Sequence, residues 1–148
     1  MKFNEFLIKA KLACYANEKK TNKKILKDGA REFSFQEDIF KYRDRYYGSN
    51  PFFGGEIVWK NDQIFWHMNY HGKILSNAVS EKEVFKFLRS SMRQVKEEEP
   101  FRGPANFKSE NFEYTNKIFG EINSFTGVER ILYRGCEIYT ADYSGGLI

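Results

Sequence analysis

The stretch from Phe52 to Gly72 reads FFGGEIVWKNDQIFWHMNYHG, and it decides the fold class of this chain. On each side of Asn61 and Asp62, aromatic and branched apolar residues alternate with polar ones. Such alternation is typical of a β-strand with one buried face, and Asn and Asp are common turn residues. The stretch therefore predicts two strands, over 54–61 and 63–70, joined by a short turn.

Further runs of the same type extend this pattern in both directions along the chain. They cover residues 31–37, 39–48, 111–120, 128–135 and 137–146. Aromatic residues make up 18% of the sequence, which favours strands because aromatic side chains suit a half-buried pleated face. We therefore expect about seven strands, with residues 101–111 as a loop.

Two other segments have the spacing of helices. In residues 2–16, apolar side chains recur every three or four positions with lysines between them. A second helix begins at Ser80, which forms a capping box with Glu83, and it ends before Pro100. Its apolar stripe consists of Val84, Phe85, Leu88, Met92 and Val95. The 148 residues are thus predicted to form one α+β domain, with two helices packed on a curved antiparallel sheet.

The later strands echo the earlier ones at a shift of 72 or 73 residues. The matched pairs include Phe40 with Phe112, Tyr42 with Tyr114 and Glu56 with Glu129. Each block follows a predicted helix, so we expect two helix-plus-meander units, residues 1–75 and 76–148. Chance alignment of aromatic-rich strands is the alternative.

The echo also includes a short polar motif near the end of each unit. Residues 69–72 read NYHG, and residues 142–145 read DYSG. Asn or Asp at the first position and Gly at the fourth is a type I turn signature. We therefore expect a chain reversal at each motif, with His71 in the turn and facing water, and His67 in the strand before it.

Seven residues in or near the repeated motifs are candidates for ligand binding: Glu56, His67, Asn69, Tyr70, Glu129, Asp142 and Tyr143. Because Glu56 and Glu129 match across the repeat, they could form a general acid–base pair near a pseudo-twofold axis. His67 is the other candidate for acid–base chemistry. The alternative that we favour for each carboxylate is an ion pair with an arginine or lysine on a neighbouring strand. The available arginines are Arg43, Arg45, Arg130 and Arg134.

The chemistry-bearing residue types are too few to specify a metal or cofactor site. The two histidines and two cysteines lack a third ligand at zinc spacing, and no glycine motif for phosphates is present. We expect no metal, no cofactor and no assigned catalytic residue. Cys14 and Cys136 lie far apart and no apolar run reaches the length of a membrane span, so a reduced, cytoplasmic protein is expected.

The net charge of +4 is partly concentrated in the loop over residues 17–28. Its first lysines are Lys19, Lys20, Lys23 and Lys24. A basic cluster can bind phosphate backbones, so nucleic-acid binding is one hypothesis. A solvated loop rich in Asn and Lys is the alternative that we favour.

Residues 52–75 and 127–148 resemble an uncharacterised bacterial domain family. The family motifs are Phe-x-Gly-x-Glu, Trp-x-Met-Asn-Tyr-x-Gly and a closing Gly-Gly-Leu-Ile. Here they are represented by Phe53, Gly55, Glu56, Trp66, Met68, Asn69, Tyr70, Gly72 and residues 145–148. Members of the family are found alone or behind a helix-turn-helix domain in transcription regulators. No activity is established for the family, so the resemblance implies no catalytic residue.

These observations lead to one expectation about function and two alternatives. We expect a non-catalytic binding domain that acts as a ligand-sensing or protein-interaction module linked to transcription regulation. One alternative is a small enzyme that uses the paired carboxylates or His67. The other is nucleic-acid binding through the lysine-rich loop. The partner is an unidentified small molecule or protein, and the sequence does not predict the oligomeric state.

Overall fold

The computed structural model describes residues 1–17, 19 and 22–148. These residues form two helices, α1 (Phe3–Ala13) and α2 (Glu81–Met92). The strands of the described residues are β1 (Lys24–Ile25), β2 (Arg31–Glu37), β3 (Phe40–Gly48), β4 (Phe52–Lys60), β5 (Gln63–Ile74), β6 (Asn106–Ser109), β7 (Phe112–Glu121), β8 (Ser124–Tyr133) and β9 (Cys136–Leu147).

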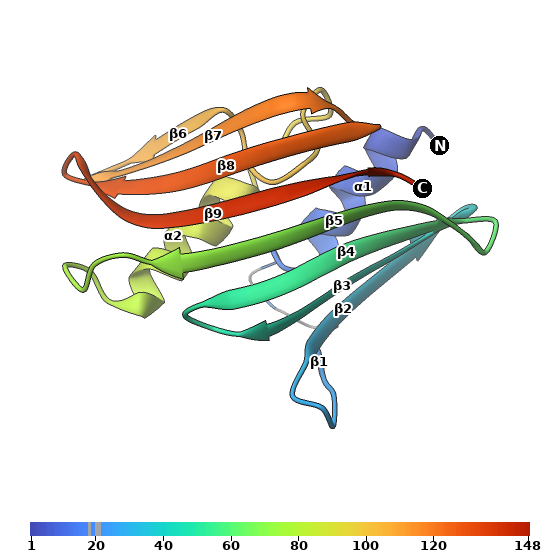
Figure 1. The fold of residues 1–148 in the computed structure, drawn as a ribbon, viewed down its shortest axis with the longest axis horizontal. Helices are drawn as coiled ribbons and strands as arrows, with labels where there is room; N and C mark the ends of the chain where they lie inside the picture. Colours follow the sequence, from blue (N-terminus) through green and yellow to red (C-terminus); the bar gives the residue numbers. More distant parts are fainter. Residues whose placement is uncertain (18, 20–21) are drawn as a thin grey trace.

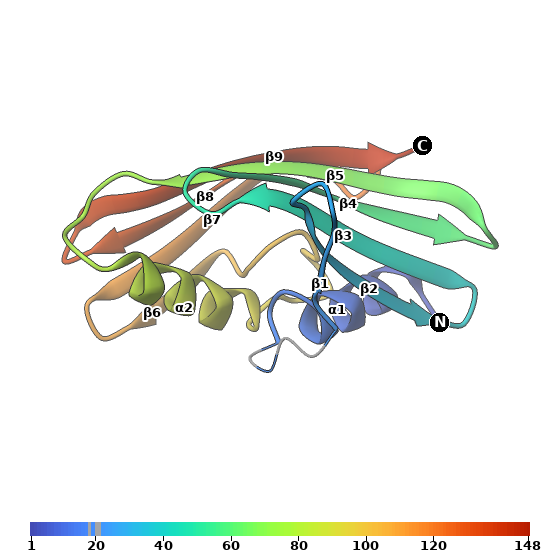
Figure 2. The same cartoon turned by 90° about the horizontal axis from the view of Figure 1, so that it is seen from below.

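All the strands belong to one antiparallel sheet in the order β1-β2-β3-β4-β5-β9-β8-β7-β6 (Figure 1). Figure 2 shows that the sheet is curved and that both helices lie on its concave side. This arrangement confirms the predicted α+β class with two helices. We call the sheet face toward the helices the inner face and the opposite one the outer face.

The predicted number of about seven strands was wrong, because the described residues form nine. The two additional strands, β1 and β6, are the edge strands and contain only two and four residues. β1 lies in the lysine-rich loop, and β6 lies in the segment expected to be a loop. Strands this short contain too few residues to produce a recognisable alternation, so their sequence gave no signal.

The NYHG motif does not reverse the chain but lies inside β5, and DYSG lies inside β9. β5 pairs with β4 on one side and with β9 on the other, so the local turn signature is overridden by two ladders of hydrogen bonds. Gly72 serves a packing role instead. A Cβ atom at this position would lie 2.3 Å from Cζ of Phe52, so only glycine leaves room for that ring.

The capping box at the start of α2 is confirmed. The Ser80 hydroxyl accepts a hydrogen bond from the backbone N–H of Glu83 at 3.3 Å and donates one to the Glu83 carboxylate at 3.0 Å. Val84 and Leu88 on the following stripe are fully buried against the inner face. Phe6, Leu7 and Ala10 of α1 are buried in the same way, so the core lies between the helices and the sheet.

Apart from the two-residue strand β1, the strand order is symmetric about the central pair β5–β9. Tyr70 of β5 pairs directly with Tyr143 of β9, and these two residues are matched by the predicted repeat. Strands β2 to β5 lie on one side of this centre and β6 to β9 on the other. We call residues 1–75 the first half and residues 76–148 the second half. Two successive helix-plus-meander units would give this order, and their origin by duplication stays a prediction.

Candidate functional site

The seven candidate residues do not lie on one surface. Glu56, Tyr70, Glu129 and Tyr143 are buried on the inner face. Asn69 and Asp142 are exposed and His67 is half-buried on the outer face, because successive residues of a strand point to opposite sides. The inner face therefore holds one group of candidates and the outer face another.

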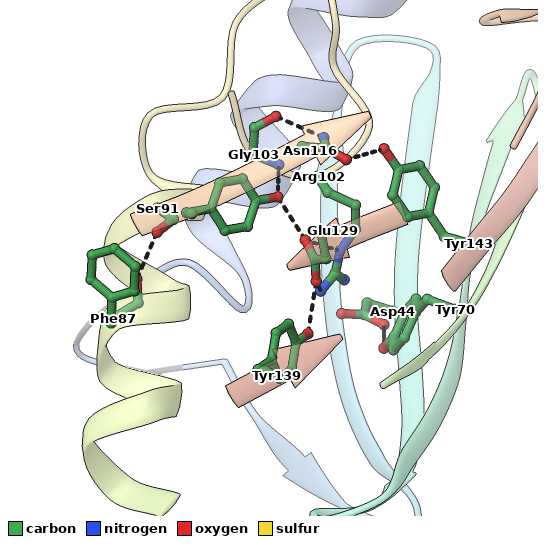
Figure 3. A network of polar contacts seen from close by, with 11 residues as sticks. Asp44, Tyr70, Phe87, Ser91, Arg102, Gly103, Asn116, Glu129, Tyr139 and Tyr143 are labelled. Atoms are coloured by element: carbon green, nitrogen blue, oxygen red, sulfur yellow. Dashed lines mark hydrogen bonds and ion pairs between the residues drawn. The ribbon is translucent and has the colours of Figure 1, made fainter. Parts of the chain in front are cut away.

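Glu129 is the centre of a fully buried polar network (Figure 3). Its Oε1 lies 2.6 Å from Nη2 of Arg102 and its Oε2 lies 3.2 Å from Nε. The hydroxyls of Tyr114 and Tyr139 donate to the same carboxylate at 2.7 and 2.8 Å. Burial alone would raise the pKa of Glu129, but the charge of Arg102 and these hydrogen bonds hold it below its ordinary value. Both oxygens of Glu129 are thus hydrogen-bonded, and its charge is paired with that of Arg102.

Glu56 occupies the position on β4 that the repeat matches with Glu129 on β8. Its counter-charge is supplied by a lysine of α1. Its Oε2 lies 2.5 Å from Nζ of Lys11, and both side chains are only 2% exposed. Burial lowers the pKa of Lys11, against the opposing effect of Glu56. Each carboxylate therefore has a buried cationic partner. Neither partner is one of the four strand arginines that the sequence offered.

The structure does not bring the two carboxylates together. The strands β4 and β8 that carry them are separated by β5 and β9. Three strand spacings amount to about 14 Å, which is too far for two groups to share a proton. Each of the two carboxylates is instead paired with a cation of its own, Glu56 with Lys11 and Glu129 with Arg102.

Asp44 is a third buried carboxyl group, which the sequence did not single out. It lies opposite Glu56 in the β3–β4 register and is 3% exposed. The Tyr70 hydroxyl donates to its Oδ1 at 2.5 Å. Burial, with the nearby charge of Glu56, raises the pKa of Asp44 to about 7. Asp44 thus titrates near neutral pH.

A cavity of about 180 Å³ opens beside Asp44, between the inner face and α2. Its buried floor consists of Asp44, Phe52, Tyr70 and Arg102. Its half-buried or exposed rim consists of Tyr15, Lys23, Arg31, Tyr46, Gly48, Ser49, Phe85 and Arg89. This volume exceeds the roughly 150 Å³ of an engineered cavity that holds benzene, so one substituted ring fits. The cavity combines cations, one acid and aromatic walls.

Two of the three outer-face candidates, Asn69 and Asp142, line a separate, open groove over β4, β5, β7, β8 and β9, whereas His67 does not. Asn69, His71 and Asp142 contribute to it, and the ring of Phe53 stacks on His71 with a centroid distance of 4.3 Å. His67 and His71 lie on this same face but do not form a metal site. Among the described residues, no group of three or more His, Cys, Asp or Glu side chains could hold a metal ion.

The four lysines of the nucleic-acid hypothesis lie in different surroundings. Lys20 falls outside the described residues. Lys19 and Lys24 are exposed, and Lys24 belongs to β1. Lys23 is half-buried and lines the inner cavity. The structure therefore directs at least one of these lysines toward the cavity.

The fold and the cavity define a class: an α+β protein in which one curved antiparallel sheet and two helices enclose a polar site. The chain belongs to the family described as a domain of unknown function, DUF5680, which matches residues 44–148. Comparisons with curated proteins and with solved structures gave no match. The matched segment begins at residue 44, so it does not include Lys11, the partner of Glu56, or Arg31 of the cavity rim. The association with helix-turn-helix regulators and the bacterial origin stay predictions.

Within the described residues, no helix is long and apolar enough to cross a membrane.

Sequence reasoning missed Asp44, Lys11 and Arg102. Asp44 could have been found, because it follows Phe40 and Tyr42 at alternate positions of a strand and so falls on the buried face. Arg102 lies in a segment without periodicity, and its partner Glu129 is 27 residues away. Lys11 lies 45 residues from Glu56. No local signal links such pairs.

Proposed function

We propose that this domain is a non-catalytic, ligand-sensing module that binds a small molecule in the cavity between the inner face and α2. The observation that carries this proposal is Asp44, a buried carboxyl group that faces the cavity. Buried polar groups are normally paired within the protein. Tyr70 donates to Oδ1 of Asp44, and a donor group on a ligand could bond to its second oxygen from the cavity.

The paired state of Glu56 and Glu129 supports binding over catalysis. Each carboxylate is held by a buried cation, so neither is available as a free acid or base. A link with transcription regulation rests on the resemblance to domains that follow helix-turn-helix segments. Binding of a ligand across β3, β5 and α2 would join elements from both halves, which is the kind of contact a sensor needs.

A thermal-shift screen of the whole chain against small metabolites tests this proposal. A ligand that binds only the folded state raises the melting temperature by mass action. We expect at least one compound to do so, and we expect Phe85→Trp to abolish the shift because the larger ring obstructs the cavity. Phe53→Trp, an equal change on the outer face, is the matched control and should preserve the shift.

Two results would contradict the proposal. The first is the absence of any stabilising compound in the screen. The second is a shift that Phe85→Trp leaves intact and Phe53→Trp removes, which would place binding in the outer groove.

A further inference from the structure

We propose that the ligand of the inner cavity is a small organic carboxylate with a flat apolar body and a hydrogen-bond donor at its opposite end. This inference rests on the proposed function and names its ligand class. It follows from the distribution of charge, apolar surface and unpaired polar atoms around the cavity.

The rim of the cavity carries two guanidinium groups without acidic partners. Arg31 of β2 donates to the backbone carbonyl of Gly48 at 3.3 Å, and Arg89 of α2 interacts with the Tyr15 hydroxyl. Within the described residues, no carboxylate forms an ion pair with either arginine. A carboxylate is the natural partner for arginine, because the guanidinium fork matches its two oxygens.

The two arginines act on the same region of the cavity. Burial raises the pKa of the Tyr46 hydroxyl to about 12, and the charges of Arg31 and Arg89 oppose this rise. Both cations thus lie within electrostatic range of one side chain on the rim. A single ligand carboxylate at this rim would interact with both.

The floor of the cavity has the opposite character. Arg102 is neutralised there by Glu129, so its charge is already compensated. Asp44 accepts one hydrogen bond, from Tyr70 to Oδ1, and no other described residue donates to its Oδ2. This oxygen belongs to a side chain that is 97% buried and lines the cavity. Within the described residues, the only buried side-chain nitrogen or oxygen without a partner is Oδ1 of Asn22, so Oδ2 of Asp44 is open to the cavity and a ligand hydroxyl group can donate to it.

The walls between rim and floor are aromatic. Phe52 and Phe85 meet edge to face, with ring centroids 6.1 Å apart. Phe52 also lies 5.9 Å from the ring of Tyr70. These surfaces suit a flat apolar body, and the basic rim and acidic floor orient it with the carboxylate outward and the donor inward.

Four matched probes test the ligand class on the wild-type chain: para-hydroxyphenylacetate, tyrosol, tyramine and phenylacetate. The first three share a phenol ring and differ in a terminal carboxylate, alcohol or ammonium group, and the fourth lacks the phenol hydroxyl. Calorimetric titration should show para-hydroxyphenylacetate binding in the micromolar to millimolar range. At pH 8, above the pKa of Asp44, we expect each of the other probes to bind about tenfold more weakly, since each lacks one charge-assisted contact.

Variants of the rim identify the groups responsible. Arg31→Gln and Arg89→Gln should each reduce the preference for para-hydroxyphenylacetate over tyrosol by about tenfold. Arg43→Gln is the control, because Arg43 lies on the outer face over the ring of Trp59 and should leave the preference unchanged. Both rim arginines are only half-buried, so these variants are expected to fold, and the probe series on the wild-type chain gives an independent answer.

Three outcomes would overturn the inference. They are equal or tighter binding of tyrosol or tyramine, a carboxylate preference that survives the loss of both arginines, and no binding of any probe at millimolar concentration. The proposed function fails separately. If the screen finds a cationic or neutral ligand that Phe85→Trp displaces, the cavity is a binding site and only the ligand class is wrong.

Discussion

The two halves of the molecule use corresponding positions on either side of the β5–β9 pair, but within the part of the chain that the structure describes only the second half is closed by its own chain. There the segment Phe101–Pro104 is buried, and the ring of Phe101 lies 4.3 Å from that of Phe125. In the first half, Phe52 corresponds to Phe125, and it lines the cavity. The same sheet architecture is thus filled by protein on one side and left open on the other.

The difference is also visible in one pair of hydrogen-bonded residues. Tyr143 donates to Oδ1 of Asn116 at 2.6 Å, and the Asn116 amide donates to the Gly103 carbonyl at 3.1 Å. Tyr70 donates to Asp44 in the corresponding way, but the second oxygen of Asp44 faces the cavity. The second half therefore has a completed network, whereas the first half has an incomplete one. The contrast indicates that the cavity lies where Asp44 of the first half lacks, among the described residues, the second hydrogen bond that Asn116 of the second half makes. The arrangement of strands around the two residues is the same in both halves.

The largest expected effect comes from breaking the completed network. Glu129→Gln leaves the buried Arg102 without a counter-charge, so the free energy of unfolding should fall by about 3–5 kcal/mol. Glu56→Gln should cost less, about 1–3 kcal/mol, because burial already lowers the pKa of Lys11 and this lysine can lose its proton. Urea unfolding at neutral pH measures both changes.

Glu121→Gln is the control for this comparison, since Glu121 is exposed at the end of β7 and should change stability by less than about 0.5 kcal/mol. Equal losses for Glu129→Gln and Glu56→Gln would show that the two halves depend on their buried ion pairs to the same degree.

A smaller difference is expected when an aromatic residue is removed from each half. Phe101→Ala should lower the free energy of unfolding by about 3 kcal/mol, because Phe101 is 3% exposed and its loss leaves a void. Phe85→Ala should cost only about 1 kcal/mol, because Phe85 is half-buried at the cavity rim. Thermal unfolding of both variants measures the difference, and a larger loss for Phe85→Ala would contradict the assignment of the first half as the open one.

The elements that the sequence predicted correctly have local causes. The β4–β5 hairpin follows from alternation around Asn61 and Asp62, and the start of α2 follows from the Ser80–Glu83 capping box. The turn predicted at residues 69–72 was wrong. Its glycine, Gly72, is required by packing inside a strand, where it makes room for the ring of Phe52, and the same residue pattern is therefore compatible with a strand. Such a requirement depends on tertiary packing, which a four-residue pattern cannot reveal.

The site was predictable only in part. Glu56, Glu129, Tyr70 and Tyr143 were found through the repeat, and all four are buried on the inner face. The cations that neutralise the two glutamates come from α1 and from the segment after α2, far away along the chain. Their pairing is set by how the helices pack on the sheet. The difference between Asp44 and Asn116, which decides where the cavity lies, gained meaning only from the structure.

An effect that appears only as the pH changes is expected when the first half receives the residue of the second. The folded pKa of Asp44 is about 7, above its ordinary value of 3.8, owing to burial and the charge of Glu56. Its contribution to stability is complete below about pH 4 and is lost as the pH rises toward 7, because only the unfolded chain releases the proton in that window. Asp44→Asn cannot titrate, while Glu56, Tyr70, Lys11 and Arg102 around it are unchanged. Between pH 5 and pH 8, the variant should therefore gain about 2 kcal/mol relative to the wild type in urea unfolding. Parallel stability curves for the two proteins would mean that Asp44 stays ionised in the folded state, and the contrast between an incomplete and a completed half would then lose its electrostatic basis.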